Sequence, residues 1–195
     1  MRQVLRASVV FVGLCTLLFG VLYPALVTGV SQAVFPAKAN GSLVLADGAV
    51  HGSRLVGQPF ADPGHLWSRP SATGPVPYNG AASSGSNLGP SNPALHDAVR
   101  ERVAALRATG PGADQPVPVD LVTTSGSGLD PHISPAAAEW QVGRIAQARG
   151  LDPAVVRQVI GRHTEGRLLG VFGEPRVNVL ATNLELDGSA RAPER

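Results

Sequence analysis

The chain has 195 residues, of which 44% are hydrophobic and only 15% are charged, a length that fits one moderate domain and an appendage. Its formal net charge of +2 depends on Arg2, Arg6 and Lys38, because residues 39–195 hold 13 basic and 14 acidic residues and carry about −1. The bulk of the chain therefore lacks the basic surface that nucleic-acid binding requires, and we expect no nucleic-acid partner.

An uncharged apolar stretch occupies residues 7–35, between Arg6 and Lys38. It is long enough to cross a bilayer, since about 20 apolar residues span the hydrocarbon core. Three glycines interrupt it and Pro24 should kink it. Such residues are tolerated where neighbouring helices pack closely, so the stretch has the features of a helix that contacts other membrane helices.

A secretory signal peptide is the alternative for this stretch. Arg2 and Arg6 could form its basic end, and "AKA" at 37–39 is a weak match to a cleavage site. However, the apolar stretch is about twice the usual 7–15 residues, and Lys38 fits poorly within such a site. We therefore predict an uncleaved transmembrane helix at 8–34.

The orientation follows from the two amino-terminal arginines. Because cytoplasmic flanks are enriched in Arg and Lys, residues 1–7 are predicted to be cytoplasmic and residues 35–195 to form one extracytoplasmic domain. Cys15 is the only cysteine and lies in the span, so the exported domain has no disulfide.

The first part of the exported domain has little regular structure. Residues 51–60 are expected to form a short strand closed by Gly57 and Pro59. Residues 61–93 are irregular and rich in Pro and Gly, a composition typical of disorder. Three large side chains nevertheless need burial, which favours an ordered loop layer: Leu66, Trp67 and Tyr78.

Three helices are predicted from one repeated start signal, a capping side chain followed by proline. The pairs are Asn92–Pro93, Ser134–Pro135 and Asp152–Pro153, and they open helices at 93–110, 135–150 and 153–164. The first helix carries an apolar stripe and should end at Gly110 and Pro111; the stripe is Leu95, Val99, Val103 and Leu106.

Two strands are predicted around these helices. Residues 118–125 are rich in β-branched side chains, and residues 176–187 alternate, with Val177 and Val179 on one face. A glycine-rich turn at 125–134 follows the first of them. Together the elements predict a single α+β domain of about three helices, a short sheet and long loops.

Motifs for independent chemistry are weak or missing. Lys38 is the only lysine and follows Ala37 rather than Gly, so there is no P-loop, and no G-x-G-x-x-G occurs. The turn "SGSGLD" at 125–130 could bind an anion through backbone N–H groups, although a tight turn is the simpler interpretation. No Cys/His cluster or H-E-x-x-H has metal-ligand spacing, and we expect no bound metal or cofactor.

A serine hydrolase is a second possibility. Ser127 lies between two glycines, but the spacing differs from G-x-S-x-G. His132 with Asp130, or His163 with Glu165, could assist a serine. A third possibility is a module that binds cell-wall sugar through Trp67 and Tyr78.

The motifs together resemble the C subunit of Kdp, the potassium-transporting P-type ATPase of bacteria. The resemblance covers nearly the whole chain and is carried by "YPALVTGVSQAVFPAKANGSLV" (23–44), "GSRLVGQPF" (52–60), "RPSAT" (69–73), "PYNGAASSGSNLGPSNPAL" (77–95), "VPVDLVTTSGSGLDPHISPAAAEWQVGRIAQARGL" (117–151) and "RVNVLATNLELD" (176–187).

The resemblance implies a non-catalytic accessory subunit in the bacterial inner membrane. In that family an A subunit selects K⁺, a B subunit hydrolyses ATP, and a small F subunit may join them, so ATP, Mg²⁺ and K⁺ are handled by the partners. The C subunit is described as a catalytic chaperone that raises the ATP affinity of the B subunit. The family's signature-like turn corresponds to Ser125, Gly126, Ser127, Gly128 and Asp130, with Gln141 downstream.

The predicted orientation conflicts with direct nucleotide contact, because an exported domain and cytoplasmic ATP lie on opposite sides of the membrane. Any effect on ATP affinity should therefore act through helix contacts and shifted conformational populations. The polar turn-rich loop is instead expected to meet the external side of the A subunit. The residues expected at that contact are Arg69, Tyr78, Asn79, Ser86, Asn87 and Asn92.

Overall fold

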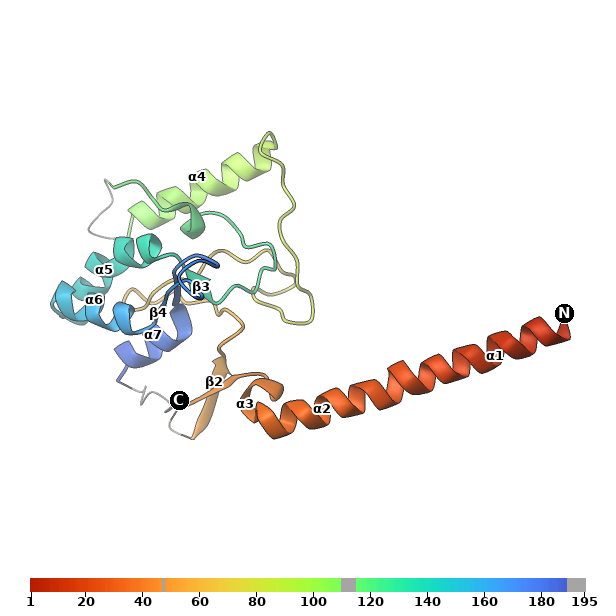
Figure 1. Cartoon of the computed structure of the whole chain (residues 1–195). Coiled ribbons are helices and arrows are strands. Elements are labelled where there is room, and N and C mark those ends of the chain that lie inside the picture. The colour runs from red at the N-terminus through yellow and green to blue at the C-terminus, as the bar shows by residue number, and fades with distance from the viewer. Residues whose placement is uncertain (47, 110–114, 189–195) are drawn as a thin grey trace. The chain divides into compact units, whose positions relative to one another are not determined.

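The computed structural model describes residues 1–46, 48–109 and 115–188, which form two compact units, Met1–Leu43 and Val44–Arg195 (Figure 1). The first unit is almost entirely helical. The second holds the remaining helices, two small sheets and a long loop. This mixture of helices and antiparallel strands after one apolar helix confirms the predicted α+β class.

The first unit contains one continuous helix, Arg2–Val34, of 33 residues, and an 18-residue stretch of it reaches a mean hydropathy of 2.3, so the helix is long and apolar enough to cross a membrane. It consists of α1 (Arg2–Leu17), a π-helical turn (Leu18–Leu22) and α2 (Tyr23–Val34). Pro24 cannot donate the hydrogen bond that a helix would direct to residue 20. The π turn lies at that position, so the helix accommodates Pro24 by a local change of hydrogen bonding. A short helix, α3 (Pro36–Ala39), follows.

The first sheet is a hairpin of β1 (Leu43–Ala46) and β2 (Ala49–Ser53). The strand predicted at 51–60 is therefore wrong beyond Ser53. The chain turns there because the Ser53 hydroxyl accepts a hydrogen bond from Leu55 N at 3.1 Å. Further on, Gly57 N donates to Leu129 O at 2.8 Å, which joins this segment to the glycine-rich turn at 125–134.

The second sheet is antiparallel, with the order β3 (His132–Ile133), β5 (Arg176–Asn178), β4 (Thr164–Glu165). Helices α5 (Pro135–Arg149), α6 (Pro153–Arg162) and α7 (Val179–Leu186) lie around it, as Figure 1 shows, and α5 and α7 both contact β5. The core between them is apolar, with α4 (Pro93–Arg107) and the loop layer packed against it. Its fully buried members include Leu66, Ile133, Ile145, Val156, Val177 and Val179.

All three predicted helix starts are confirmed, in α4 (Pro93–Arg107), α5 (Pro135–Arg149) and α6 (Pro153–Arg162). Each capping side chain accepts from a backbone N–H of the first turn: Asn92 from Ala94 at 2.9 Å, Ser134 from Ala137 at 3.0 Å, and Asp152 from Ala154 at 2.7 Å. On the α4 stripe, Leu106 is buried and the other members are partly buried. The predicted end of α4 at Gly110 and Pro111 lies outside the described residues.

The strand predicted at 118–125 is wrong. Its first part forms a 3₁₀ turn at Val119–Leu121 instead, in which Leu121 N donates to Pro118 O at 3.1 Å and Val122 N donates to Val119 O at 3.2 Å. Asp120 accepts from Ser134 N at 2.7 Å, and Arg102 donates to Val122 O at 2.8 Å. Val122 is buried here without forming a ladder, whereas Val119 stays exposed.

The strand predicted at 176–187 is correct for three residues only. After β5 the chain enters α7 (Val179–Leu186), because Asn178 accepts from Ala181 N at 3.0 Å and caps a helix. Every residue from 177 to 184 is buried. The spacing of apolar residues therefore shows neither the two-residue period of a strand nor the 3.6-residue period of a helix, and it cannot distinguish the two. The described part of this unit thus has four helices of eight residues or more, not three.

Candidate functional site

Residues 62–67 of the loop layer are fixed by two buried amide side chains. Asn183 Oδ1 accepts from Leu66 N at 2.7 Å, and its Nδ2 donates to Leu66 O at 2.9 Å. Gln141 binds the backbone of Trp67 in the same way: its Oε1 accepts from Trp67 N at 2.8 Å, and its Nε2 donates to Trp67 O at 3.3 Å. Each amide thus replaces the partner strand that an extended segment would have in a sheet.

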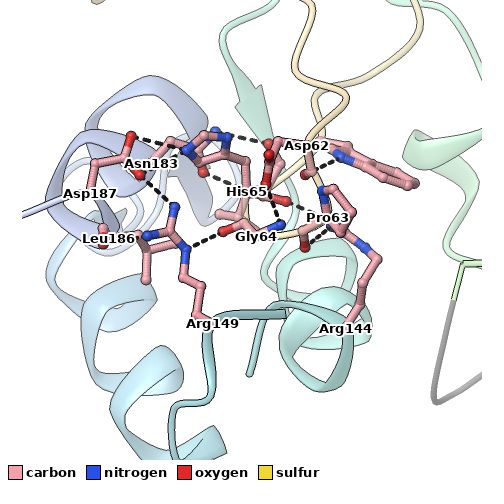
Figure 2. Close-up of polar contacts among 11 residues, drawn as sticks. Asp62, Pro63, Gly64, His65, Arg144, Arg149, Asn183, Leu186 and Asp187 are labelled. Atoms are coloured by element: carbon pink, nitrogen blue, oxygen red, sulfur yellow. Dashed lines mark hydrogen bonds and ion pairs between the residues drawn. The ribbon is translucent and has the colours of Figure 1, made fainter. Parts of the chain in front are cut away.

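Arg144 and Arg149 of α5 bind the same segment from beneath (Figure 2). Arg144 donates to Pro63 O at 2.5 Å and to His65 O at 3.0 Å, and its guanidinium lies 3.8 Å from the centre of the Trp67 ring. Burial lowers the pKa of Arg144 to about 10, although the Asp62 carboxylate opposes this shift. Arg144 therefore stays charged at neutral pH, with carbonyl oxygens and an aromatic face around it.

Arg149 connects the loop to the end of α7. It donates to Gly64 O at 2.5 Å and to Leu186 O at 2.6 Å, and pairs with Asp187 at 2.5 Å. His65 Nε2 lies 2.9 Å from the same carboxylate. We name the four side chains Gln141, Arg144, Arg149 and Asn183 the loop clamp; only Gln141 was among the residues expected from the sequence.

A second set of contacts joins the two groups of residues that the sequence singled out. The turn at 125–130 lies against the loop: Ser84 N donates to Ser127 O at 3.0 Å, and the Ser71 hydroxyl donates to Gly128 O at 2.7 Å. Thr124 Oγ1 lies 3.2 Å from Ser86 Oγ. We name residues 69–87 with 124–130 the loop face.

The centre of the loop face is an ion pair with a partly buried phenol beside it. Arg69 Nη1 lies 3.3 Å from Asp130 Oδ2, its Nη2 donates to Thr124 O at 3.2 Å, and Tyr78 OH donates to Arg69 O at 2.5 Å. Burial raises the pKa of Tyr78 above its ordinary 10.0. Burial also acts to raise the pKa of Asp130, but hydrogen bonds from His132 and the charge of Arg69 outweigh it and hold that pKa below 3.8.

This ion pair predicts a loss of stability in acid. Because the folded-state pKa of Asp130 is depressed, its contribution is complete well above pH 3.8 and is lost as the pH falls through the folded-state value. Asp130→Asn should therefore reduce the difference in unfolding free energy between pH 6 and pH 3, measured by urea denaturation at each pH. Asp97→Asn is the control, since Asp97 is exposed and pairs only with Arg100 among the described residues. An unchanged pH dependence in Asp130→Asn would contradict this role.

The other residues expected at the contact have diverse surroundings. Asn79 Nδ2 donates to Gly74 O at 2.9 Å, and its Oδ1 accepts from Ala81 N at 3.0 Å. Asn92 caps α4. Asn87 is exposed and has a left-handed backbone with φ of 53°. Gln141 belongs to the loop clamp and not to the turn that precedes it in sequence.

The geometry does not favour hydrolysis or sugar stacking. Ser127 Oγ accepts from Leu129 N at 3.1 Å. His163 bonds Glu185 at 2.6 Å instead of Glu165. The Trp67 ring packs against the Arg144 guanidinium, and its Nε1 donates to Asp62 O at 2.9 Å. These contacts stabilise the fold and occupy the ring face that a sugar would stack on.

A hollow of about 450 Å³, lined by both charged and apolar residues, borders the loop face and is open to solvent. Arg69, Asp130 and His132 form one side of it, and Arg176 contributes from β5. All the interactions described here join segments of one chain. What the arrangement achieves is a rigid surface made from loops.

Comparison with known proteins gives one consistent family. Residues 5–188 match the family model described as the K⁺-transporting ATPase, c chain. The chain is 63% identical to the potassium-transporting ATPase KdpC subunit of Sorangium cellulosum (strain So ce56), over 95% of this chain and 97% of that protein. It is 59% identical to the KdpC subunit of Polaromonas naphthalenivorans (strain CJ2), over 96% and 95%, and 57% identical to that of Variovorax paradoxus (strain S110), over 98% and 100%. These matches, from the apolar helix through the loop face to α7, show that the chain belongs to the KdpC family of potassium-transporting ATPase subunits.

Proposed function

We propose that this chain is a non-catalytic accessory subunit that stabilises a K⁺-transporting P-type ATPase in the bacterial plasma membrane. The observation that carries the proposal is the family match over residues 5–188, which includes both the apolar helix and the folded domain. Relatives matched over 95% or more of their length are named as subunits of such an ATPase. The partners would be the K⁺-selecting A subunit, the ATP-hydrolysing B subunit and the small F subunit.

The proposed topology is a single span at residues 8–34, with residues 1–7 in the cytoplasm and residues 35–195 outside. Arg2 and Arg6 support it, because positive residues beside a span favour the cytoplasmic side. In this orientation the span lies among the membrane helices of the partners. The loop face and the loop clamp then belong to the external side of the complex.

We further propose that the chain raises the ATP affinity of the B subunit indirectly. Since ATP is cytoplasmic, the folded domain cannot contact it, and ATP, Mg²⁺ and K⁺ would be bound by the partners. The chain can instead stabilise the conformation of the complex that binds ATP better. A subunit with differential affinity for two conformations shifts their populations by that difference.

The external contact is assigned to the exposed part of the loop face around Asn87. This side chain is exposed, and its backbone conformation is uncommon for a residue other than glycine. Arg69, Tyr78 and Ser86 shape this surface from within through the contacts described above. Asn92 would contribute by starting α4 where the loop ends.

Purification of the complex through a tag on this chain tests the proposal. We expect a P-type ATPase to copurify in stoichiometric amount. We also expect a complex prepared without this chain to need roughly fivefold more ATP or more for half-maximal hydrolysis, the lower range of allosteric coupling. Absence of an ATPase from the purified material, or an ATP requirement that is independent of this chain, would contradict the proposal.

The same preparation tests the contact at Asn87. Asn87→Ala should lower the yield of complex while the chain still folds, whereas Gln147→Ala, on the exposed surface of α5, should not. Equal yields of complex from the two variants would show that Asn87 does not contribute to the contact, and the assignment of the chain as a subunit would be unaffected. Asn92→Ala is unsuitable here, because it also removes a helix cap worth about 1 kcal/mol.

A further inference from the structure

The hairpin between β4 and β5 ends in an exposed apolar tip that takes no part in the core. Leu168, Leu169, Val171 and Phe172 keep 70%, 84%, 70% and 64% of their surface exposed, and residues 168–173 include no charge. Four such side chains present roughly 400 Å² of apolar surface, which is the scale of the largest patch on a typical monomer and is often functional.

The tip has a fixed shape. Leu168 N donates to Phe172 O at 2.9 Å, and Phe172 N donates back to Leu168 O at 3.0 Å, which closes the turn. Leu169 has a left-handed backbone with φ of 54°, followed by Gly170 at 74°. A bulky residue in that region is uncommon and costs roughly 1–2 kcal/mol, so the surrounding turn must impose it.

The stalk of the hairpin is electrically neutral and joined to the core. Arg167 pairs with Glu174 at 2.8 Å, and Arg176 pairs with Glu165 at 2.7 Å, one pair above the other across the two arms. Below them Thr164 lies opposite the fully buried Val177. The tip is therefore held at a set distance from the core on a stalk whose charges are internally matched.

We propose that this tip, Leu168 to Phe172, inserts into an uncharged apolar pocket on another protein subunit of the complex, outside the membrane. The inference rests on the proposed function and adds a second contact that is apolar, unlike the polar loop face. The fixed shape of the tip favours a protein pocket as its binding site, because insertion into fluid lipid does not require a fixed shape. The neutral stalk also lacks the excess Lys or Arg, and the hairpin lacks the Trp, that mark segments bound at membrane surfaces.

A second copy of this chain is a poor occupant. The tip offers far less than the about 1,200 Å² that stable specific interfaces bury in total, so it cannot hold two copies together by itself. It can act as an anchor within a larger interface, where a few buried apolar side chains carry much of the binding energy. That situation requires a partner already held by other contacts, such as those of the span.

Site-specific photocrosslinking in the intact complex tests the occupant. A benzophenone amino acid replaces Leu169 in the full chain, coexpressed with the other subunits, and Val119 serves as a control position because it is 70% exposed on another segment. We expect position 169 to crosslink to another subunit and position 119 not to. Crosslinks from position 169 to lipid alone, to a second copy of this chain, or to nothing would each overturn the inference. Copurification of an ATPase in the same sample shows separately whether the proposed function stands.

A release measurement tests the energetic contribution. Leu169→Asn with Phe172→Ser keeps residues suited to the turn and removes apolar surface. We expect this double variant to leave the detergent-solubilised complex about tenfold faster on dilution than the native chain, as loss of an interface anchor would cause. The rate ratio should be the same at 50 and 500 mM salt, since no charge is removed. Val119→Ser should release at the native rate, and equal rates for the double variant and the native chain would overturn the inference.

Discussion

Asn183→Leu is expected to lower the free energy of unfolding of the folded domain by about 2–5 kcal/mol. Asn183 is 1% exposed, and it satisfies both the N–H and the carbonyl of Leu66, which is itself fully buried. Leucine has a similarly branched side chain but cannot pair with either group. Each buried polar group left without a partner costs about 1–3 kcal/mol, so two of them would remove much of a domain's stability.

Urea denaturation of the full-length chain in detergent measures this effect. The two tryptophans, Trp67 and Trp140, report on the loop and on α5. Gln147→Leu is the matched control, because it makes a similar change from amide to leucine on the exposed side of a helix and should stay within about 0.5 kcal/mol of the native chain. If Asn183→Leu and Gln147→Leu unfold at the same urea concentration, the loop clamp does not hold the loop.

The second large effect is expected at Gly128. Its φ is +68°, and a Cβ atom there would lie 2.5 Å from Ser84 O and 2.6 Å from Thr73 Cγ2. Gly128→Ala should cost about 1–2 kcal/mol for the left-handed backbone, and about 1–3 kcal/mol more for displacing the loop. It should also lower the yield of purified complex, since the loop face would lose its shape.

Gly126→Ala offers a control two residues away in the same turn. A Cβ at Gly126 meets no atom within 4 Å, and its φ is not in the left-handed range. We expect its stability to differ from that of the native chain by less than about 0.5 kcal/mol. Thermal denaturation of the two variants side by side gives the comparison. Similar midpoints would show that the turn and the loop are not closely packed.

Local signals in the sequence predicted the helix starts well, because capping is a short-range effect. Asn92, Ser134 and Asp152 each precede a proline, and each was found to cap the expected helix. The ordered loop layer was likewise predictable from Leu66, which had to be buried somewhere. These features depend on neighbours in sequence or on burial alone.

The wrong predictions concern segments whose structure depends on distant partners. The composition of residues 118–125 is typical of a strand. In the structure, however, the Asp120 carboxylate accepts a hydrogen bond from Ser134 N, and Arg102 donates one to Val122 O. Residues 177–184 are all buried, so their pattern of apolar residues cannot distinguish a strand from a helix. In both cases tertiary contacts override β propensity.

The candidate site was predictable in part. Gln141 lies on a stripe of α5 with Ala138, Val142 and Ile145, so helical spacing alone places this amide in the core. Its partner Trp67, 74 residues earlier, carries no sequence mark of that pairing. The pairing of Asn183 with Leu66 could not be predicted either, because Asn183 lies in a segment that was predicted to be a strand. The resemblance to Kdp C subunits, by contrast, was readable from ordered motifs and was confirmed by the family match.

The side of the membrane on which the folded domain lies is the central claim, and a thiol label measures it directly. In a Cys15→Ser background, Arg100→Cys places one thiol on an exposed part of α4. We predict that a membrane-impermeant maleimide added to spheroplasts labels residue 100 without permeabilisation, whereas a cysteine at residue 2 is labelled only after it. Labelling of residue 100 only from the cytoplasmic side would contradict the proposed topology and the indirect action on ATP affinity that depends on it.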